Sequence, residues 1–169
     1  DGPFAPDRYR VRIDSDAQGR LRTTDRGLRR DLGADVDTLP SSAAVTQALD
    51  EDRYDRAPWN RAVLSFRNRL EGWRPFGLHN QVHVWVGGDM APATSPNDPV
   101  FYLNHCNVDR IWQGWMTRRG PSYAPPQTAS PDLRWHRIDD PMYSLLTTTP
   151  VTPAQMLDVT AYYSYDALP

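Results

Sequence analysis

Proline and glycine interrupt this chain so often that only four stretches are long and regular enough to predict helices. The 169 residues include 16 prolines and 10 glycines, and both residue types end regular structure. The four stretches lie within residues 40–51, 60–73, 78–86 and 95–120. Alternation at Tyr9, Val11 and Ile13 predicts an extended arm or a short strand, and the Pro-, Ser- and Thr-rich chain after Gly120 predicts a long wrapping tail. We therefore expect a mainly α-helical fold with long loops and little β structure.

Apolar spacing and capping residues support these helices. Val45 and Leu49 are four residues apart in the first stretch, and Val63, Phe66 and Leu70 follow helical spacing in the second. Residues that favour helix ends flank the stretches. These are Ser41 or Ser42, Gly72, Gly87, Asp98 followed by Pro99, and Gly120. The ends of the helices are therefore predicted as well as their number.

Size and charge limit the possible functions. A chain of 169 residues is the size of one domain and can bury a core. Its 19 basic and 21 acidic residues give a formal charge of −2, which offers no electrostatic reason to expect nucleic acid or an anionic membrane as a partner. Cys106 is the single cysteine, so no internal disulfide can form. Without a long apolar run or a signal-peptide pattern, we expect a soluble chain with no signal peptide of its own.

Three of the four histidines predict a metal site. A lone histidine is usually a core or surface residue, but His79 and His83 are four residues apart on one helix face, which is a spacing used to chelate metals. His105 lies on the last helix, and Asp109 four residues later could hold its imidazole in one tautomer. His136 has no partner at a useful spacing, so we expect no metal role for it.

The identity of the metal stays open at this point. Asn80 occupies the place of the glutamate in the H-E-x-x-H motif, which excludes a zinc protease of that type. Three neutral imidazoles suit copper or zinc, and imidazole ligands alone do not choose between them.

Two segments around these histidines resemble the tyrosinases, a family of type-3 copper proteins. LHNQVHVWVGG and SPNDPVFYLNHCNVDRIW are similar to the second copper-binding half, CuB, of bacterial tyrosinases. DGPF resembles the segment that follows the first copper site, CuA; FRNRLEGW resembles the stretch before the CuB histidines, and AYYSYD the tyrosine motif that closes the catalytic domain. The resemblance implies the CuB half of a four-helix-bundle domain, in which two copper ions on three histidines each use dioxygen to oxidise phenols to quinones.

The resemblance also implies roles for individual residues. His79, His83 and His105 match the three CuB ligands, so this chain would bind one copper ion of the two in a complete site. Glu71 and Asn80 match the pair that in tyrosinases holds a water that deprotonates the incoming phenol, as a carboxylate and an amide beside a Lewis-acidic metal can do. From the residues alone, Glu71 would be a solvated charge at a helix end and Asn80 a polar residue on an exposed helix face.

Other residues near the motif have a family role and an ordinary alternative. Met90 and Thr94 match the loop at the substrate entrance, and a connector without substrate contact is the alternative. Cys106 directly follows a ligand, and we interpret it as a small buried thiol in preference to a thioether or a metal ligand. Asn104 replaces a histidine that the family usually has beside the ligand. With Asp109, it is expected to shape the surroundings of the metal.

The histidine count predicts a partner. A site for two copper ions on three histidines each needs six histidines, and this chain has four. We expect residues 1–169 to form a single incomplete catalytic domain with an uncovered apolar face. Another polypeptide, or a fragment cleaved from this one, would carry the CuA histidines. A copper-delivery protein and a small phenolic substrate are the other expected partners, in a bacterium and in a compartment, secreted or cytoplasmic, that the sequence does not fix.

Two functions are then in play. The first is the dioxygen-dependent oxidation of phenols. Asparagine at position 104 cannot titrate near neutral pH as histidine does, which favours ortho-diphenols or ortho-aminophenols over monophenols. The alternative is a non-catalytic subunit of the same fold that holds copper or dioxygen. Glu71 and Asn80 favour the enzyme, because an oxygen carrier needs no base beside a substrate site.

Overall fold

A computed structural model describes residues 2–5, 7–72, 77–144 and 148–169. The described chain is mainly helical, as predicted, with one small sheet. Its helices are α1 (Ser42–Leu49), α2 (Phe66–Glu71), α3 (Leu78–Val86) and α4 (Val100–Arg119), and its strands are β1 (Val11–Ser15) and β2 (Leu21–Arg26). Short 3-10 turns include η1 (Gly88–Met90), η2 (Ser95–Asn97), η3 (Pro131–Leu133) and η4 (Ala154–Met156). Asp1 of the DGPF segment and Trp73 of FRNRLEGW lie outside the described residues.

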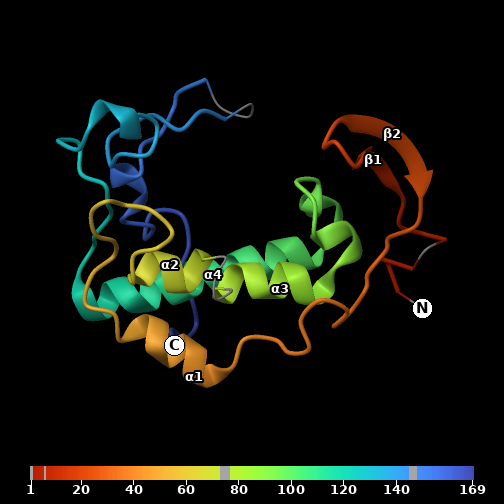
Figure 1. Ribbon diagram of the computed structural model, residues 1–169, viewed down its shortest axis with the longest axis horizontal. Coiled ribbons are helices and arrows are strands. Elements are labelled where there is room, and N and C mark those ends of the chain that lie inside the picture. Colours follow the sequence, from red (N-terminus) through yellow and green to blue (C-terminus); the bar gives the residue numbers. More distant parts are fainter. Residues whose placement is uncertain (1, 6, 73–76, 145–147) are drawn as a thin grey trace.

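The long helix α4 organises the fold. Helices α2 and α3 follow one another along it, and α1 packs against α2 and α4 at one end (Figure 1). The β1–β2 hairpin lies beyond the C-terminal end of α3, away from α1 and α2 (Figure 1). Much of the chain after α4 lies on the side of α1 and α2. The functional helix α3 is thus placed between the hydrophobic core and the hairpin.

The core joins α1, α2 and α4. Its buried members are Ala48, Leu49, Phe66, Leu70, Leu78, Ile111, Trp115 and Met116. The rings of Phe66 and Trp115 stack with their centroids 4.7 Å apart, and Trp115 Nε1 donates a hydrogen bond of 2.8 Å to the carbonyl of Glu51. Because Leu78 is the first residue of α3, this core also fixes where α3 begins.

Side-chain caps mark the starts of α1 and α2. Ser41 caps α1 as predicted, since its hydroxyl accepts from the Ala44 amide. The second helix is shorter than predicted, because Ser65 accepts from the Asn68 amide and begins the helix there, which leaves Val63 in the preceding turn. Asp98 Oδ1 accepts from the Val100 amide, but the residue directly before α4 is Pro99, which provides no side-chain cap.

The helix ends follow the predicted glycines. Gly87 ends α3 with φ at 61° and Gly120 ends α4 with φ at 88°, backbone angles that glycine adopts without steric cost. Gly72 follows α2 and donates to the Asn68 carbonyl. The boundaries of α3 and the end of α4 are therefore confirmed.

The predicted N-terminal strand is one half of an antiparallel hairpin. β1 pairs with β2, with Asp14 opposite Arg22 and Ser15 opposite Leu21. β2 was not predicted, because its sequence LRTTDR is polar and most of its residues are exposed, so it lacks the apolar alternation that marks a strand.

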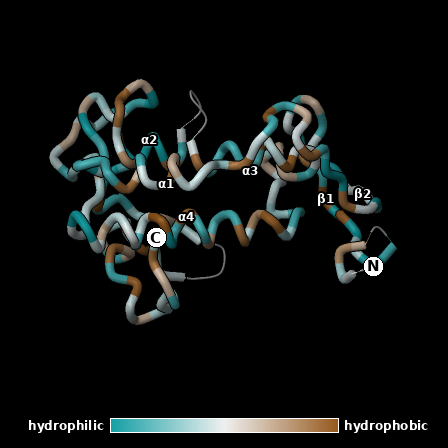
Figure 2. Tube along the Cα trace, turned by 90° about the horizontal axis from the view of Figure 1, so that it is seen from below, coloured by the Kyte–Doolittle hydropathy of each residue, from teal (hydrophilic) through white to brown (hydrophobic). Residues whose placement is uncertain are grey.

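The chain after Gly120 forms the predicted wrapping tail. Its last residues return to α4, where Arg110 donates to the carbonyl of Ala167 and Arg118 to that of Pro169. Among the described residues, no helix combines the length and the apolar character needed to cross a membrane. The longest of these helices, α4, is not apolar enough because hydrophilic and hydrophobic residues alternate along it (Figure 2).

Candidate metal centre

Helices α3 and α4 bring His79, His83 and His105 together. One ring nitrogen from each of these residues lies within 4.8 Å of the others, and the Nε2 atoms of His79 and His105 are 3.2 Å apart. This is the only cluster of three or more potential metal ligands found among the described residues. The spacing of four residues in α3 and the packing of α3 on α4 therefore produce the site that the sequence predicts.

The ring of His83 is oriented by a backbone carbonyl. Its Nδ1 lies 2.7 Å from the carbonyl oxygen of Met90. A carbonyl oxygen only accepts hydrogen bonds, so Nδ1 carries the proton and Nε2 keeps its lone pair. That Nε2 atom is buried and has no hydrogen-bond partner among the described residues. A buried, unpaired acceptor facing two other imidazoles fits a metal ion.

Burial lowers the pKa of two of the three imidazoles, those of His83 and His105. Desolvation lowers the pKa of His83, and the neighbouring His79 lowers it further. Desolvation likewise lowers the pKa of His105, with smaller contributions from His79 and His83. Phe101 stacks on the His105 ring at a centroid distance of 3.9 Å and contributes to this apolar environment. Neutral imidazole is the form that binds a metal, so the lowered pKa values of His83 and His105 favour metal binding.

Glu71 and Asn80 lie beside the cluster. Glu71 Oε2 is 2.9 Å from Nδ1 of His79, although that nitrogen has no partner with hydrogen-bond geometry. The Glu71 side chain is 52% exposed, so a substrate or a water can reach its carboxylate. It is therefore a carboxylate next to a candidate ligand and also accessible from solvent.

Asn80 is buried, which overturns the alternative of a polar residue on an exposed helix face. It is 3% exposed, and its Nδ2 donates to the backbone carbonyls of Glu71 and Gly72. Both amide protons are then used by the backbone, so only Oδ1 remains to face a water. Asn80 therefore ties the end of α2 to the start of α3 and holds Glu71 at the cluster.

Two predictions about α4 are wrong. Among the described residues, Asp109 makes no hydrogen bond to His105, and its Oδ2 accepts instead from the hydroxyls of Tyr163 and Tyr165 at 2.7 and 2.6 Å. Burial, and next the hydrogen bond to this carboxylate, raise the pKa of both tyrosines. Cys106 is exposed and not a buried thiol, and its Sγ lies 3.9 Å from the Tyr165 hydroxyl. Asp109 therefore anchors the tail.

The remaining predicted residues surround the cluster in different ways. Met90 is fully buried, so its side chain does not line an open entrance, whereas its carbonyl oxygen orients His83. Thr94 is half-buried directly before η2. Asn104 is buried, and its Nδ2 donates a long hydrogen bond of 3.4 Å to the carbonyl of His79. His136 lies in the chain after α4, outside the cluster.

The site includes two features that the sequence analysis missed. The carbonyl of Met90 and the ring of Phe101 both act on ligands. Phe101 precedes His105 by four residues in α4, so helical spacing offered a signal for it. A backbone carbonyl has no sequence signal, and its role becomes visible only when the turn after α3 is placed in space.

Comparison with known proteins gives consistent matches. The family described as the common central domain of tyrosinase matches residues 2–118. The chain is 45% identical over 166 residues to a tyrosinase of Streptomyces glaucescens and 43% identical to one of Streptomyces antibioticus, each match covering 98% of this chain and 57% of the relative. It is also 40% identical to grixazone synthase of Streptomyces griseus, over 82% of this chain and 48% of that relative. The chain thus spans about half the length of the curated relatives it matches.

Proposed function

This chain belongs to the tyrosinase family, and from that premise we propose that it binds one copper ion and acts in the oxidation of phenols by dioxygen. The observation that supports this most directly is the convergence of His79, His83 and His105 within 4.8 Å. The buried, unpaired Nε2 of His83 and the lowered pKa values of His83 and His105 fit a copper ligand set. When bound, copper supplies one-electron chemistry towards dioxygen.

The residues of this chain would handle the proton of the substrate. The carboxylate of Glu71 is accessible and lies beside His79, so it can accept the phenol proton, directly or through a water that Asn80 Oδ1 helps to hold. Deprotonation makes the phenol oxygen a better metal ligand and an easier group to oxidise. The hydrogen bonds from Asn80 to the end of α2 keep this carboxylate in place.

A second set of copper ligands would come from a polypeptide segment outside these 169 residues. The chain has four histidines, and three of them form the cluster. The curated relatives are also longer than this chain. Helix α4 exposes 62% of Tyr102 and 71% of Leu103 close to His105. An apolar surface of this kind suits burial against the segment that carries CuA.

We further propose that the protein oxidises ortho-diphenols or ortho-aminophenols readily and hydroxylates monophenols poorly. Asn104 is buried beside the cluster, and an amide there can neither titrate near neutral pH nor take a proton as an imidazole does. Hydroxylation of a monophenol needs that phenol to be deprotonated and placed correctly, whereas oxidation of a catechol is less demanding.

Turnover of a monophenol and of its matching catechol, before and after Asn104→His, tests this preference. We expect Asn104→His to raise the ratio of monophenol to catechol turnover. Equal ratios in the two proteins would mean that Asn104 does not set the preference, while the copper assignment would stand.

Copper analysis combined with an absorption spectrum after peroxide addition tests the main proposal. The complete protein should bind copper at this cluster, consume dioxygen with a catechol, and show the absorption of a coupled copper pair. Copper binding without phenol oxidation would instead support a non-catalytic copper- or dioxygen-binding subunit. Unchanged copper content after His83→Ala would refute the site itself.

A further inference from the structure

We infer that Asp89 and Arg26 are positioning residues for copper, because they hold the turn whose carbonyl orients His83. This inference rests on the proposed copper site. It concerns residues that contact neither the cluster nor a substrate. The connection runs from the β1–β2 hairpin through Asp89 to the carbonyl of Met90, and from there to the His83 ring.

The first link is the hydrogen bond between His83 and Met90. A helix position fixes the Cα and Cβ of a histidine, but rotation of the ring decides which nitrogen faces the metal. The Met90 carbonyl, 2.7 Å from Nδ1, holds the ring with Nε2 towards the cluster. A shift of this carbonyl would allow the ring to rotate or to change tautomer.

The second link is the turn η1, which ends at Met90. Its middle residue, Asp89, is 4% exposed. The Asp89 Oδ2 atom accepts from the backbone amide of Arg29 at 2.8 Å, and the Asp89 amide donates to the Arg29 carbonyl at 2.9 Å. These two hydrogen bonds attach the turn to the segment that leaves the hairpin.

The third link is Arg26, the last residue of β2. Its guanidinium donates to both carboxylate oxygens of Asp89, with Nη1 2.7 Å from Oδ2. The same guanidinium donates to Asp14 Oδ2 of β1 at 2.8 Å. The side chains of Asp14, Arg26 and Asp89 are only 10, 15 and 5% exposed. A two-pronged arginine between two buried carboxylates has one well-defined geometry.

Close backbone packing shows that the turn and this segment fit without spare room. Gly88 has φ at 52°, and a Cβ there would overlap the carbonyl of Arg29. At Gly87, a Cβ would lie 2.9 Å from the carbonyl oxygen of Asp31. The Asp31 amide also donates to the Val86 carbonyl at 2.9 Å. Because the contact is this close, a displacement of the hairpin is transmitted to the turn.

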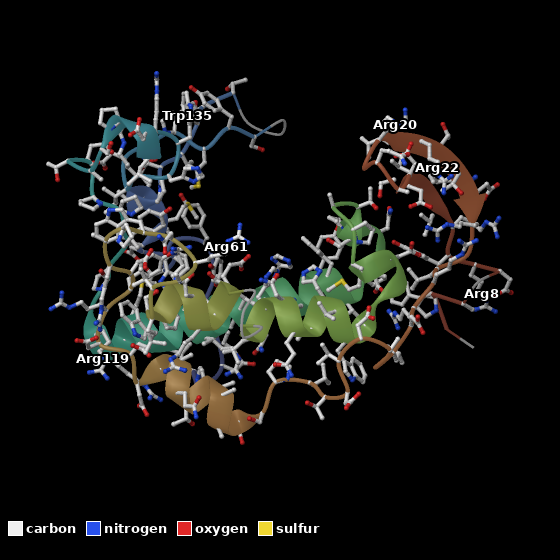
Figure 3. The ribbon with its side chains drawn as sticks, viewed as in Figure 1. Arg8, Arg20, Arg22, Arg61, Arg119 and Trp135 are labelled. Carbon is white, nitrogen blue, oxygen red and sulfur yellow. The ribbon has the colours of Figure 1, made fainter. Side chains whose placement is uncertain are left out.

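Other hairpin arginines provide a contrast. Arg20 and Arg22 lie on the hairpin away from α3 (Figure 3), and their side chains are 76 and 61% exposed. Arg20 pairs only locally, with Asp16 four residues before it. Arg26 is thus the arginine through which the hairpin reaches the turn at η1, and Arg20 is a matched control on the same hairpin.

The test compares Asp89→Asn with Asp140→Asn in the complete protein. Both aspartates are buried, and each accepts hydrogen bonds from an arginine side chain and from the backbone. Asp140, however, lies in the tail, where its partners are Arg137 and the backbone amide of Trp135. We expect Asp89→Asn to weaken copper binding about 10-fold in competition with a chelator, at the lower end of the range for residues that orient ligands. Asp140→Asn should leave copper affinity unchanged.

A second readout examines the ring itself. In the metal-free protein, ¹⁵N NMR should show His83 protonated at Nδ1, and Asp89→Asn should give a mixture of tautomers. Arg26→Gln should act like Asp89→Asn, whereas Arg20→Gln should have no effect on either readout. Thermal unfolding of each variant identifies the temperature range in which it is folded.

Three outcomes would contradict the proposals, and they are distinguishable. Unchanged copper affinity and an unchanged His83 tautomer in folded Asp89→Asn would overturn the positioning role alone. An equal loss of affinity in Asp140→Asn would reduce the effect to general destabilisation and would also overturn it. Unchanged copper binding in His83→Ala would overturn the proposed copper site instead.

Discussion

Replacing Asn80 by alanine separates the role of this residue in the fold from its role in the site. Its Nδ2 donates to the carbonyls of Glu71 and Gly72 in a buried position. The Gly72 carbonyl keeps the Gly77 amide as a donor at 2.6 Å, whereas the Glu71 carbonyl loses the donor described here. Each of the two hydrogen bonds contributes about 1 kcal/mol net. We therefore expect Asn80→Ala to lose about 2 kcal/mol of unfolding free energy.

In a chain of this size, that loss lowers the melting temperature by about 4–8 °C. Asn68 offers a matched control, since its Nδ2 also donates to two backbone carbonyls, those of Asn60 and Val63. Asn68 is half-buried and is not one of the clustered residues, so Asn68→Ala should cost somewhat less. Only Asn80→Ala should also lower catechol turnover at temperatures where both variants are folded.

Thermal denaturation and catechol turnover, measured on both variants, check this prediction. A melting temperature of Asn80→Ala within 1 °C or so of the unchanged protein would refute the hydrogen-bond reasoning. Equal loss of turnover in the two variants would refute the specific role of Asn80 in holding Glu71.

Three further predictions concern the histidine cluster and the hydrophobic core. His105→Ala should abolish copper retention and oxidation, which metal analysis and oxygen uptake measure; normal turnover would reject the ligand set. The metal-free protein should lose stability as the pH falls below about 6.5. Burial lowers the folded-state pKa of His83 and His105, so the unfolded chain binds more protons at these histidines than the folded chain does. Denaturant titrations from pH 7.5 to 5 measure this loss, and an unfolding free energy that does not change with pH would contradict the prediction. Trp115→Ala should cost about 3–5 kcal/mol in urea unfolding, since this side chain is fully buried against Phe66; a cost under 1 kcal/mol would show that the stack contributes little.

The sequence predicted the end of a helix best where a glycine marks it. α3 ends at Gly87 because glycine accepts the positive φ needed there. The second helix began later than predicted, because apolar spacing included Val63 but the Ser65 hydroxyl caps the Asn68 amide. A cap that forms a specific hydrogen bond thus overrides a hydrophobic spacing that continues past it.

Residues that depend on distant parts of the chain were harder to predict. The i, i+4 spacing from His105 to Asp109 permits the predicted contact. The Asp109 carboxylate accepts instead from the hydroxyls of Tyr163 and Tyr165, which lie more than 50 residues away in the sequence. Likewise, Cys106 is exposed although it adjoins a ligand in the sequence. Spacing along one helix shows which contacts are possible, whereas the path of the tail decides which of them form.

The three histidines were predictable because their arrangement needs only the helix spacing in α3 and the packing of α3 on α4. The orientation of the His83 ring was not predictable, because it depends on the turn that the hairpin contacts. Spacing in α3 places His79 and His83 one turn apart, and packing on α4 adds His105. These contacts leave the rotation of the His83 ring undetermined. The Met90 carbonyl determines it, and that carbonyl is placed through Asp89 by Arg26, a residue of the polar strand that the sequence did not reveal as a strand. A polar strand with little apolar surface of its own thus contacts the turn after α3, which connects the least predictable element of the fold to the most predictable feature of the site.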